Sequence, residues 1–252
     1  MDVELREFIP ELVYKIKNIK LNFFPYVHCE VPNFLPKTLL KLIEKNFPED
    51  KEFIPLTNAN SVSLNKDDIQ TYSNRKCLNI YDDSLSHQMN EKKLAFWKQF
   101  QHIFNSLEIV TSFLTNHPQY MNSRYPNGTS GVSFSTRSQI ISDKTNYALG
   151  PHTDNPGKLF TLLIYLNDAT EDPESNIGTS VYTPKTTNFI CKRGTHHKHE
   201  EFIKMYTSSF QKNNVFGFYR TDNSFHGVEK ITNSSKARKL IQYSIWDNEA
   251  FK

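Results

Sequence analysis

The chain lacks the sequence features that mark several large classes of protein. It has three cysteines, Cys29, Cys77 and Cys191, which are widely spaced and form no CxxC pair. An odd, scattered set of this kind is typical of a reducing compartment rather than of a disulfide framework. The longest apolar run, Leu159 to Leu166, is far shorter than the ~20 residues of a membrane helix, and the acidic segment Met1 to Arg6 has no apolar signal core. We therefore expect a cytoplasmic protein.

Long charged runs are also missing. The 252 residues carry a net charge of +3, and no cluster of lysine and arginine reaches the length of a basic arm or patch. Nothing in this balance indicates a nucleic-acid partner. The sequence contains no internal repeat and no low-complexity tract. All-β barrels or sandwiches of ~200 to 250 residues are often single domains, so we expect one domain that covers residues 1–252.

Helical periodicity dominates the first half of the chain. Asn90 is a suitable N-cap for a helix that runs until Pro118, because apolar residues recur there at every third or fourth position. The pattern predicts one long amphipathic helix, and a shorter helix is predicted to begin at Pro36. Residues 5–20 are ambiguous, since Pro10 interrupts a helix in that segment.

From Val132 onward the period of the pattern changes to two. The alternation as far as Ile140 predicts a strand, whereas the run Leu159 to Leu166 is apolar on both faces and must be covered on both sides. Further short strands are predicted at residues 179–182, 189–192, 215–219, 227–231 and 238–246. Six or more short strands after helices predict an α+β chain, mainly β, with a jelly-roll core.

Three residues in this second half are candidate ligands of one metal ion. His152 and Asp154 are two positions apart, and in an extended chain such residues point to the same side. His226 follows after several predicted strands. Two imidazoles and one carboxylate on one face of an octahedral ion leave three positions open, which is the ligand pattern of non-haem Fe(II) oxygenases.

Each of these residues also has a simpler interpretation. A histidine beside a proline, as His152 is, commonly lies in a turn, and His226 could lie at the edge of a strand. Asp154 begins the sequence Asp-Asn-Pro-Gly, so its carboxylate could cap a turn. Both roles of Asp154 are compatible if one oxygen binds metal and the other is held by the turn.

Arg238 is a candidate anchor for an anion. It shares one face of the last predicted strand with Leu240, Gln242 and Ser244, and this face is more polar than the opposite one. A guanidinium inside a barrel needs an anionic partner, and arginine can hold a carboxylate with two parallel hydrogen bonds. Lys239 is an alternative cation for the same task, as is the lysine two residues before Arg238.

These motifs occur in a characteristic order. They are Leu149–Asp154, Leu159–Asn167, Ser224–Val228 and Arg238–Trp246. In this order, over roughly residues 130–247, the chain resembles the Fe(II)/2-oxoglutarate-dependent dioxygenase superfamily, on its prolyl-hydroxylase-like side. The segment Phe24–Pro36 is similar to an N-terminal segment of bacterial and phage members. The resemblance implies a double-stranded β-helix, cupin-like, at residues 130–247, with the mainly helical residues 1–125 packed on its outer sheet as support.

The resemblance also implies an activity. Fe(II) would be held by His152, Asp154 and His226, and 2-oxoglutarate would be fixed at its far carboxylate by Arg238. Tyr165 would either assist that carboxylate or pack in the core. With O2, and with ascorbate as a stimulant, the enzyme would hydroxylate an unactivated C–H bond of a peptidyl proline, an amino acid or a sugar-linked small molecule, releasing succinate and CO2. Related halogenases have a small residue in place of Asp154, so hydroxylation is expected rather than halogenation.

Two other classes of function stay open. One is a non-catalytic jelly-roll binding module, and the other is a zinc-dependent hydrolase that uses the same three ligands or the cluster His196–Glu200. Arg238 argues against both, because neither needs a buried carboxylate anchor. We expect His196–Glu200 to be an exposed loop beside the mouth of the site, followed by a helix-like segment at Glu201–Met205. Tyr147 could line that mouth or merely pack.

Overall fold

The computed structural model describes residues 4–55, 74–81, 89–168, 177–187, 189, 191, 196–232 and 237–250. The helices are α1 (Ile9–Lys17), α2 (Lys37–Asn46), α4 (Glu91–Phe104), α5 (Leu107–Thr115) and α6 (Pro118–Arg124). The strands are β1 (His28–Val31), β2 (Ile54–Pro55), β3 (Arg75–Asn79), β4 (Phe134–Asp143), β5 (Leu149–His152), β6 (Lys158–Tyr165), β7 (Ser180–Pro184), β8 (Phe202–Thr207), β9 (Val215–Tyr219), β10 (His226–Val228) and β11 (Arg238–Asp247). No helix in the described ranges is both long enough and apolar enough to cross a bilayer.

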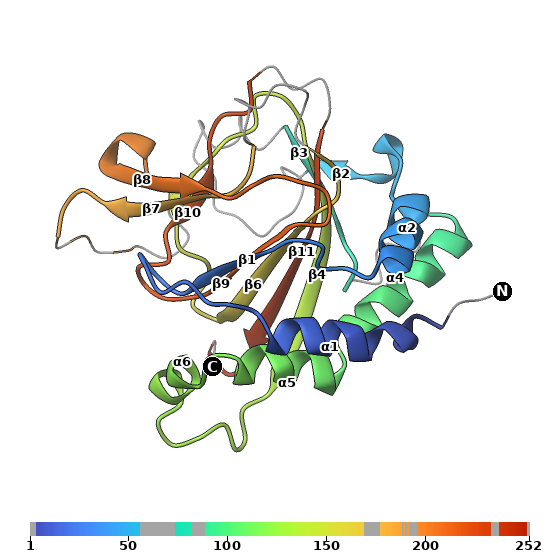
Figure 1. Cartoon of the computed structure of the whole chain (residues 1–252). Helices are drawn as coiled ribbons and strands as arrows, with labels where there is room; N and C mark the ends of the chain where they lie inside the picture. Colours follow the sequence, from blue (N-terminus) through green and yellow to red (C-terminus); the bar gives the residue numbers. More distant parts are fainter. Residues whose placement is uncertain are drawn as a thin grey trace.

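The strands form two antiparallel sheets. The larger has the order β1-β9-β6-β11-β4-β3-β2, and the smaller has the order β5-β10-β7-β8. Neighbours in each order come from distant parts of the chain, as they do in a jelly roll. In Figure 1 the smaller sheet lies on one side of the larger sheet, and the helices lie on the other side. The prediction of a mixed chain that is mainly β is confirmed, and both of its sheets are antiparallel.

One hydrophobic cluster joins the helices to the larger sheet. Phe104 of α4 meets Tyr243 of β11 at 5.3 Å between ring centroids, and Phe113 of α5 stacks on Phe160 of β6 at 4.6 Å. All four side chains are less than 2% exposed. Burying aromatic rings of this size contributes much of the stability of such a core. The cluster holds the helices against one face of the larger sheet, and the opposite face of β6 and β11 points toward the smaller sheet.

Strand β11 divides its residues between these two sides as its alternation predicted. Ile241, Tyr243 and Ile245 belong to the helix-side cluster, whereas Arg238 and Gln242 line a cavity between the sheets. Strand β6 is buried at every position, which confirms that this apolar run is covered on both faces.

The helices differ from their prediction in two places. The expected long helix breaks at Asn105, because Ser106 caps α5 by accepting a hydrogen bond from the Ile109 backbone N–H. Pro118 begins α6 instead of ending a helix. Pro10 does not prevent α1, since it lies in the first turn, where its missing N–H has no intrahelical partner to lose. Helix α2 follows Pro36 as predicted.

The segment expected to be helix-like at Glu201–Met205 is mainly strand, so that prediction was wrong. A 3-10 turn at His199–Glu201 leads into β8, which pairs with β7 at the edge of the smaller sheet. Three consecutive residues of β8 are exposed, so the strand lacks the alternation that would identify it. The strand expected at 189–192 falls partly outside the described residues.

Candidate metal centre

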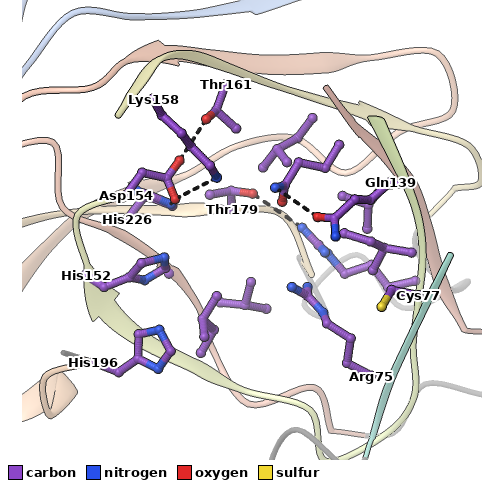
Figure 2. Close-up of a pocket in the computed structure, with 18 residues that line it drawn as sticks. Arg75, Cys77, Gln139, His152, Asp154, Lys158, Thr161, Thr179, His196 and His226 are labelled. Atoms are coloured by element: carbon purple, nitrogen blue, oxygen red, sulfur yellow. Dashed lines mark hydrogen bonds and ion pairs between the residues drawn. The ribbon is translucent and has the colours of Figure 1, made fainter. Parts of the chain in front are cut away.

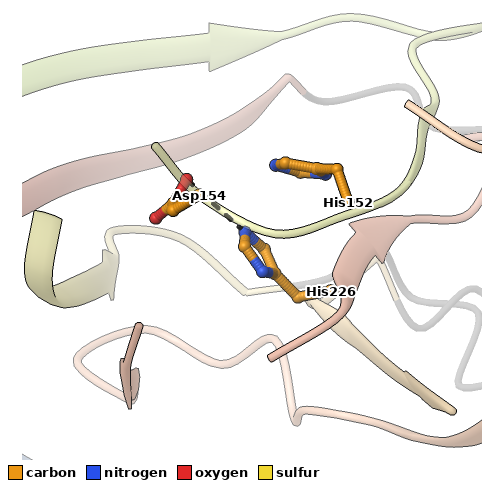
Figure 3. A group of neighbouring side chains, drawn as sticks. All are labelled: His152, Asp154 and His226. Atoms are coloured by element: carbon orange, nitrogen blue, oxygen red, sulfur yellow. Dashed lines mark ion pairs between the residues drawn. The ribbon is translucent and has the colours of Figure 1, made fainter. Parts of the chain in front are cut away.

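The three predicted metal ligands lie together at one end of the smaller sheet. His152 ends β5 and His226 begins β10, and the two residues are direct partners in the antiparallel β5–β10 pair. Their ring centroids are 4.3 Å apart. Asp154 follows β5 by two residues, and its Oδ1 is 3.9 Å from His226 Nε2. One ligand atom from each residue lies within 4.8 Å of the other two. Figure 3 shows the three side chains grouped together.

Both imidazoles are oriented for ligation through Nε2. Nδ1 of His152 lies 3.0 Å from the Gly150 carbonyl oxygen, and Nδ1 of His226 lies 3.0 Å from the Ser224 carbonyl oxygen. A carbonyl oxygen only accepts hydrogen bonds, so each Nδ1 carries the proton and each Nε2 keeps its lone pair. This is the usual arrangement of a metal-binding histidine, in which a partner on one nitrogen fixes the tautomer for the other.

The carboxylate of Asp154 is held on both oxygens. Thr161 Oγ1 donates a 2.7 Å hydrogen bond to Oδ2, and Lys158 Nζ lies 3.1 Å from Oδ1. The turn that follows is capped by Asn155, whose side chain accepts a hydrogen bond from the Gly157 N–H. The turn-capping role considered for Asp154 therefore belongs to Asn155, and the oxygen that faces His226 is not used by the turn.

Electrostatics favour the ligand forms of all three residues. Burial would raise the pKa of Asp154, but Lys158, His226 and His152 together with the Thr161 hydrogen bond hold it well below its ordinary value. Burial lowers the pKa of His226. Burial also lowers the pKa of His152, and the neighbouring His226 and His196 add to that decrease. The cluster thus presents two neutral imidazoles and one carboxylate at neutral pH, which are the protonation states that bind metal.

A cavity of about 190 Å³ opens beside this cluster, between the two sheets. In Figure 2, Asp154, His152 and His196 lie on one side of it, and Arg75, Cys77 and Gln139 lie on the other. Its apolar wall consists of Ile141, Leu149, Leu163, Val228 and Leu240. A small polar molecule in this space would contact the three candidate ligands at one end and guanidinium groups at the other.

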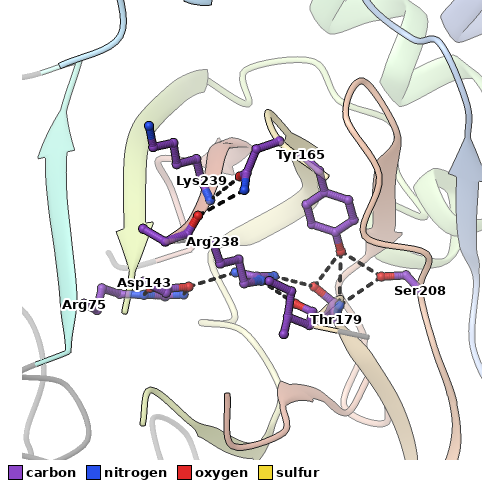
Figure 4. Close-up of polar contacts among 10 residues, drawn as sticks. Arg75, Asp143, Tyr165, Thr179, Ser208, Arg238 and Lys239 are labelled. Carbon is purple, nitrogen blue, oxygen red and sulfur yellow. Dashed lines mark hydrogen bonds and ion pairs between the residues drawn. The ribbon is translucent and has the colours of Figure 1, made fainter. Parts of the chain in front are cut away.

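Arg238 lines this cavity and is 1% exposed, so it is not a solvated strand-end residue. Its Nε donates to the Ile177 carbonyl oxygen at 2.6 Å, NH1 to Asp143 Oδ2 at 2.9 Å and NH2 to Thr179 Oγ1 at 3.3 Å. Figure 4 shows this network. Two of the five N–H groups of the guanidinium have no acceptor within the described part of the chain.

Asp143 and Arg75 are part of the same network, and the sequence analysis missed both. Arg75 donates to Asp143 from Nε at 2.6 Å and from NH2 at 2.8 Å, and its guanidinium lies 4.2 Å from the centroid of the Tyr147 ring. The available signal was that Asp143 ends the alternating strand β4 on the same face as Gln139 and Ile141, which line the cavity. The pairing of β3 with β4 could not be predicted, because β3 is short and its partner lies far along the chain.

The two predicted tyrosines are absent from the residues that line the cavity. The Tyr165 hydroxyl lies 3.0 Å from Thr179 Oγ1 and 2.7 Å from Ser208 Oγ, and Tyr147 is completely buried beneath Arg75. Thr179 lines the cavity and bridges Tyr165 to Arg238. Tyr165 is thus placed to orient Thr179.

The histidine cluster differs from the exposed loop that we expected. His196 lines the cavity, and its ring centroid is 4.7 Å from that of His152. The half-buried His197 packs against Phe189 at 4.8 Å and Phe202 at 5.6 Å. Within the described residues, the ligand atoms of His152, Asp154 and His226 lie close enough to share one ion, whereas His196–Glu200 contains no such group.

Comparison with known proteins supports the fold. No model of a known protein family matches the sequence, and no curated protein matches it. Among solved structures, the epimerase SnoN from nogalamycin biosynthesis, a non-haem α-ketoglutarate-dependent enzyme, has a TM-score of 0.50 at 10% identity and covers 95% of this chain and 80% of its own. A prolyl-4-hydroxylase from Pseudomonas putida has a TM-score of 0.49 at 11% identity, and the match covers 95% of this chain and 99% of the hydroxylase. For a Phytophthora capsici prolyl 4-hydroxylase the TM-score is 0.47 and the sequence identity 13%. That match covers 98% of this chain but only 65% of the hydroxylase.

The solved structures that match include prolyl hydroxylases and other 2-oxoglutarate/Fe(II) oxygenases. The fold of SnoN, which has a TM-score of 0.50, is thus similar to the fold of this chain. At 10% identity this likeness concerns the fold, and the activity has to be argued from the residues of this chain.

Proposed function

We propose that this chain is an Fe(II)- and 2-oxoglutarate-dependent dioxygenase that hydroxylates an unactivated C–H bond. The observation that carries the proposal is the arrangement of His152, Asp154 and His226 around one point beside a cavity that also contains a buried arginine. We propose further that residues 1–252 act as one catalytic domain in a double-stranded β-helix with the helices on its outer sheet, and that the protein is cytoplasmic.

The donor set fits Fe(II). Two imidazole nitrogens and one carboxylate oxygen form the facial triad that leaves positions for a chelating co-substrate and O2. The hydrogen bonds from His152 Nδ1 to Gly150, from His226 Nδ1 to Ser224 and from Thr161 to Asp154 are the kind of outer contacts that orient such ligands. When bound, iron with 2-oxoglutarate and O2 would supply oxidative decarboxylation to succinate and CO2, coupled to hydroxylation of the substrate.

The cavity fits a keto-diacid. Arg238 is buried and has two N–H groups without an acceptor in the described part, so a carboxylate could be held there by charge-assisted hydrogen bonds. Thr179 lies beside it with a hydroxyl held by Tyr165. In this proposal Arg238 and Thr179 receive the distal carboxylate, and Tyr165 acts through Thr179. We propose that the apolar side chains of the wall limit the access of water to the reacting atoms.

The competing classes are less well supported. A binding module does not require two fixed histidine tautomers and a low-pKa carboxylate around one point. A zinc hydrolase does not require a buried guanidinium in the adjoining cavity. We propose a peptide or small molecule as substrate, with no nucleic acid or membrane involved, and ascorbate as a stimulant that keeps the iron reduced.

The direct test is turnover of 2-oxoglutarate to succinate by the Fe(II)-loaded protein over a panel of peptidyl-proline, amino-acid and sugar-linked compounds. The proposal predicts succinate formation above background, increased by one class of compound, with a product heavier by one oxygen atom. His152→Ala should abolish it. Incorporation of chloride in place of hydroxyl would contradict the hydroxylase assignment, and zinc-dependent hydrolysis without 2-oxoglutarate consumption would support the alternative.

A further inference from the structure

Three charged residues form one row across the larger sheet. In the registers of the β3–β4 and β4–β11 pairs, Arg75 and Arg238 are both direct partners of Asp143. The Asp143 carboxylate therefore lies between two guanidinium groups, and its Oδ2 accepts a hydrogen bond from each of them. Figure 4 shows Arg75, Asp143 and Arg238 in this order.

The three side chains are removed from water. The Asp143 side chain is 0% exposed, that of Arg238 1% and that of Arg75 11%. Together they carry one net positive charge, because one carboxylate is shared by two guanidinium groups. In a weakly screened environment this charge favours the entry of an anion. A single carboxylate group has the charge that matches it.

Both guanidinium groups are at the wall of the cavity, and both are held rigidly. Arg75 is fixed by two hydrogen bonds to Asp143 and by the Tyr147 ring under its guanidinium plane. Arg238 is fixed by Ile177, Asp143 and Thr179. Such preorganisation lowers the cost of binding, because less side-chain freedom is lost when the anion arrives.

Lys158 also lines the cavity, but it does not add to this net positive charge. Lys158 is on the side of the candidate metal ligands, where its ammonium lies 3.1 Å from Asp154 Oδ1. These two opposite charges balance each other. The net charge of the Arg75, Asp143 and Arg238 group is thus localised at the side of the cavity where Arg75 lies.

We propose that Arg75 and Arg238 form a two-guanidinium site for one carboxylate, in which Asp143 holds the two groups side by side. Arg75, on a strand outside the motifs that carry the sequence resemblance, is then a further binding residue. The identity of the anion rests on the proposed function: it is the distal carboxylate of 2-oxoglutarate, and the keto-acid end of the same molecule faces His152, Asp154 and His226.

The test is an anaerobic titration of the Fe(II)-loaded protein with two ligands, followed by the visible absorption of the chelate. The first ligand is 2-oxoglutarate, and the second is 2-oxopentanoate, which has the same keto-acid end and a methyl group in place of the distal carboxylate. Arg75→Gln should weaken the binding of 2-oxoglutarate by about tenfold or more and leave the affinity for 2-oxopentanoate nearly unchanged. Only the first ligand presents a distal carboxylate to Arg75.

The matched control is Lys76→Gln. Lys76 is the next residue on β3, and its ammonium bonds to Asp50 Oδ2 at 2.7 Å, away from the cavity. This variant loses the same charge and should keep both affinities. Arg75→Lys, which retains a partner for Asp143, guards against misfolding of the glutamine variant. It should weaken the binding of 2-oxoglutarate by a smaller factor, about threefold, since an ammonium lacks the planar set of N–H donors that a guanidinium offers to a carboxylate.

The outcomes separate the inference from the proposed function. If Arg238→Gln weakens the binding of 2-oxoglutarate but not that of 2-oxopentanoate, and neither Arg75 variant has this effect, the two-guanidinium site is refuted and the proposed function stands. If Arg75→Gln weakens both ligands equally, Arg75 has a structural role only and the inference fails. If neither ligand produces a chelate band in the unmodified protein, the proposed function fails, and the inference fails with it.

Discussion

Arg238 and Asp143 face each other directly across the β11–β4 pair, with NH1 of the arginine 2.9 Å from Oδ2 of the aspartate. Both side chains are at most 1% exposed. Because the strand register places the carboxylate, it also determines where the guanidinium meets the cavity. The same register places Arg75 on the other side of Asp143.

Asp143→Ala should destabilise the protein strongly. Removal of the carboxylate takes a hydrogen-bond partner from the buried guanidinium of Arg238 and from the largely buried guanidinium of Arg75. Loss of one member of a buried ion pair costs about 3–5 kcal/mol. Urea unfolding followed by circular dichroism measures this free energy. Asp50→Ala is the control, since Asp50 is 62% exposed and pairs with Lys76 at the surface, where about 1 kcal/mol or less is expected. Equal losses for the two variants would show that the buried network does not stabilise the fold.

Thr161→Val should weaken metal binding without unfolding the chain. The substitution preserves shape and removes the 2.7 Å hydrogen bond to Asp154 Oδ2, which orients the carboxylate. Loss of such an outer contact lowers metal affinity by about 10- to 100-fold. Calorimetric titration with Mn(II) measures it. Thr183→Val, which removes a hydroxyl from β7 that contacts Met205, should leave Mn(II) affinity unchanged. An unchanged affinity in Thr161→Val would mean that Asp154 is oriented by other contacts.

Gly227→Ala should disturb the metal centre through the backbone. A methyl group at Gly227 would run into the carbonyl oxygen of Leu149, so β10 and β5 would have to separate at the point where His226 and His152 are paired. Lower stability and weaker Mn(II) binding are both expected. In Gly128→Ala the added methyl meets no neighbour, and only backbone strain at a φ of +82° is introduced. That variant should lose some stability and keep its metal affinity, whereas loss of Mn(II) binding in Gly128→Ala alone would contradict this explanation.

Cys29 should resist alkylation in the folded protein. Burial raises the pKa of its thiol from 9.0 to about 12, so the thiolate that reacts is scarce at pH 8. The raised pKa also means that the neutral thiol stabilises the fold below pH 9, and that this contribution is lost as the pH rises from about 9 toward 12. Mass spectrometry after brief treatment with iodoacetamide at pH 8 should find the half-buried Cys191 labelled first. Labelling of Cys29 at the rate seen in urea would contradict its burial.

The sequence singled out three residues that the fold brings together, but it did not predict all of the strands that carry them. His152 and Asp154 are close because they are near in sequence, and His226 joins them through the β5–β10 pair. Strand β5 itself was not predicted, because its four residues include a glycine and a proline. The structure nevertheless needs Gly150 there, since a side chain would collide with the backbone of His197.

The charged network of the cavity could not be predicted from local patterns. Arg75, Asp143 and Arg238 come from strands whose pairing depends on the whole fold, and periodicity describes only one strand at a time. For the same reason the exposed edge strand β8 was mistaken for a helix-like segment. The polar face of β11 was predicted correctly because its alternation lies within a single strand.

The central claim is that His152, Asp154 and His226 hold one Fe(II) ion to which 2-oxoglutarate chelates. Anaerobic addition of 2-oxoglutarate to the Fe(II)-loaded protein tests it most directly. The account predicts a weak visible charge-transfer band that saturates at one iron per chain and is missing in His226→Ala. A band that is absent from the unmodified protein, or that keeps its full intensity in His226→Ala, would contradict the account.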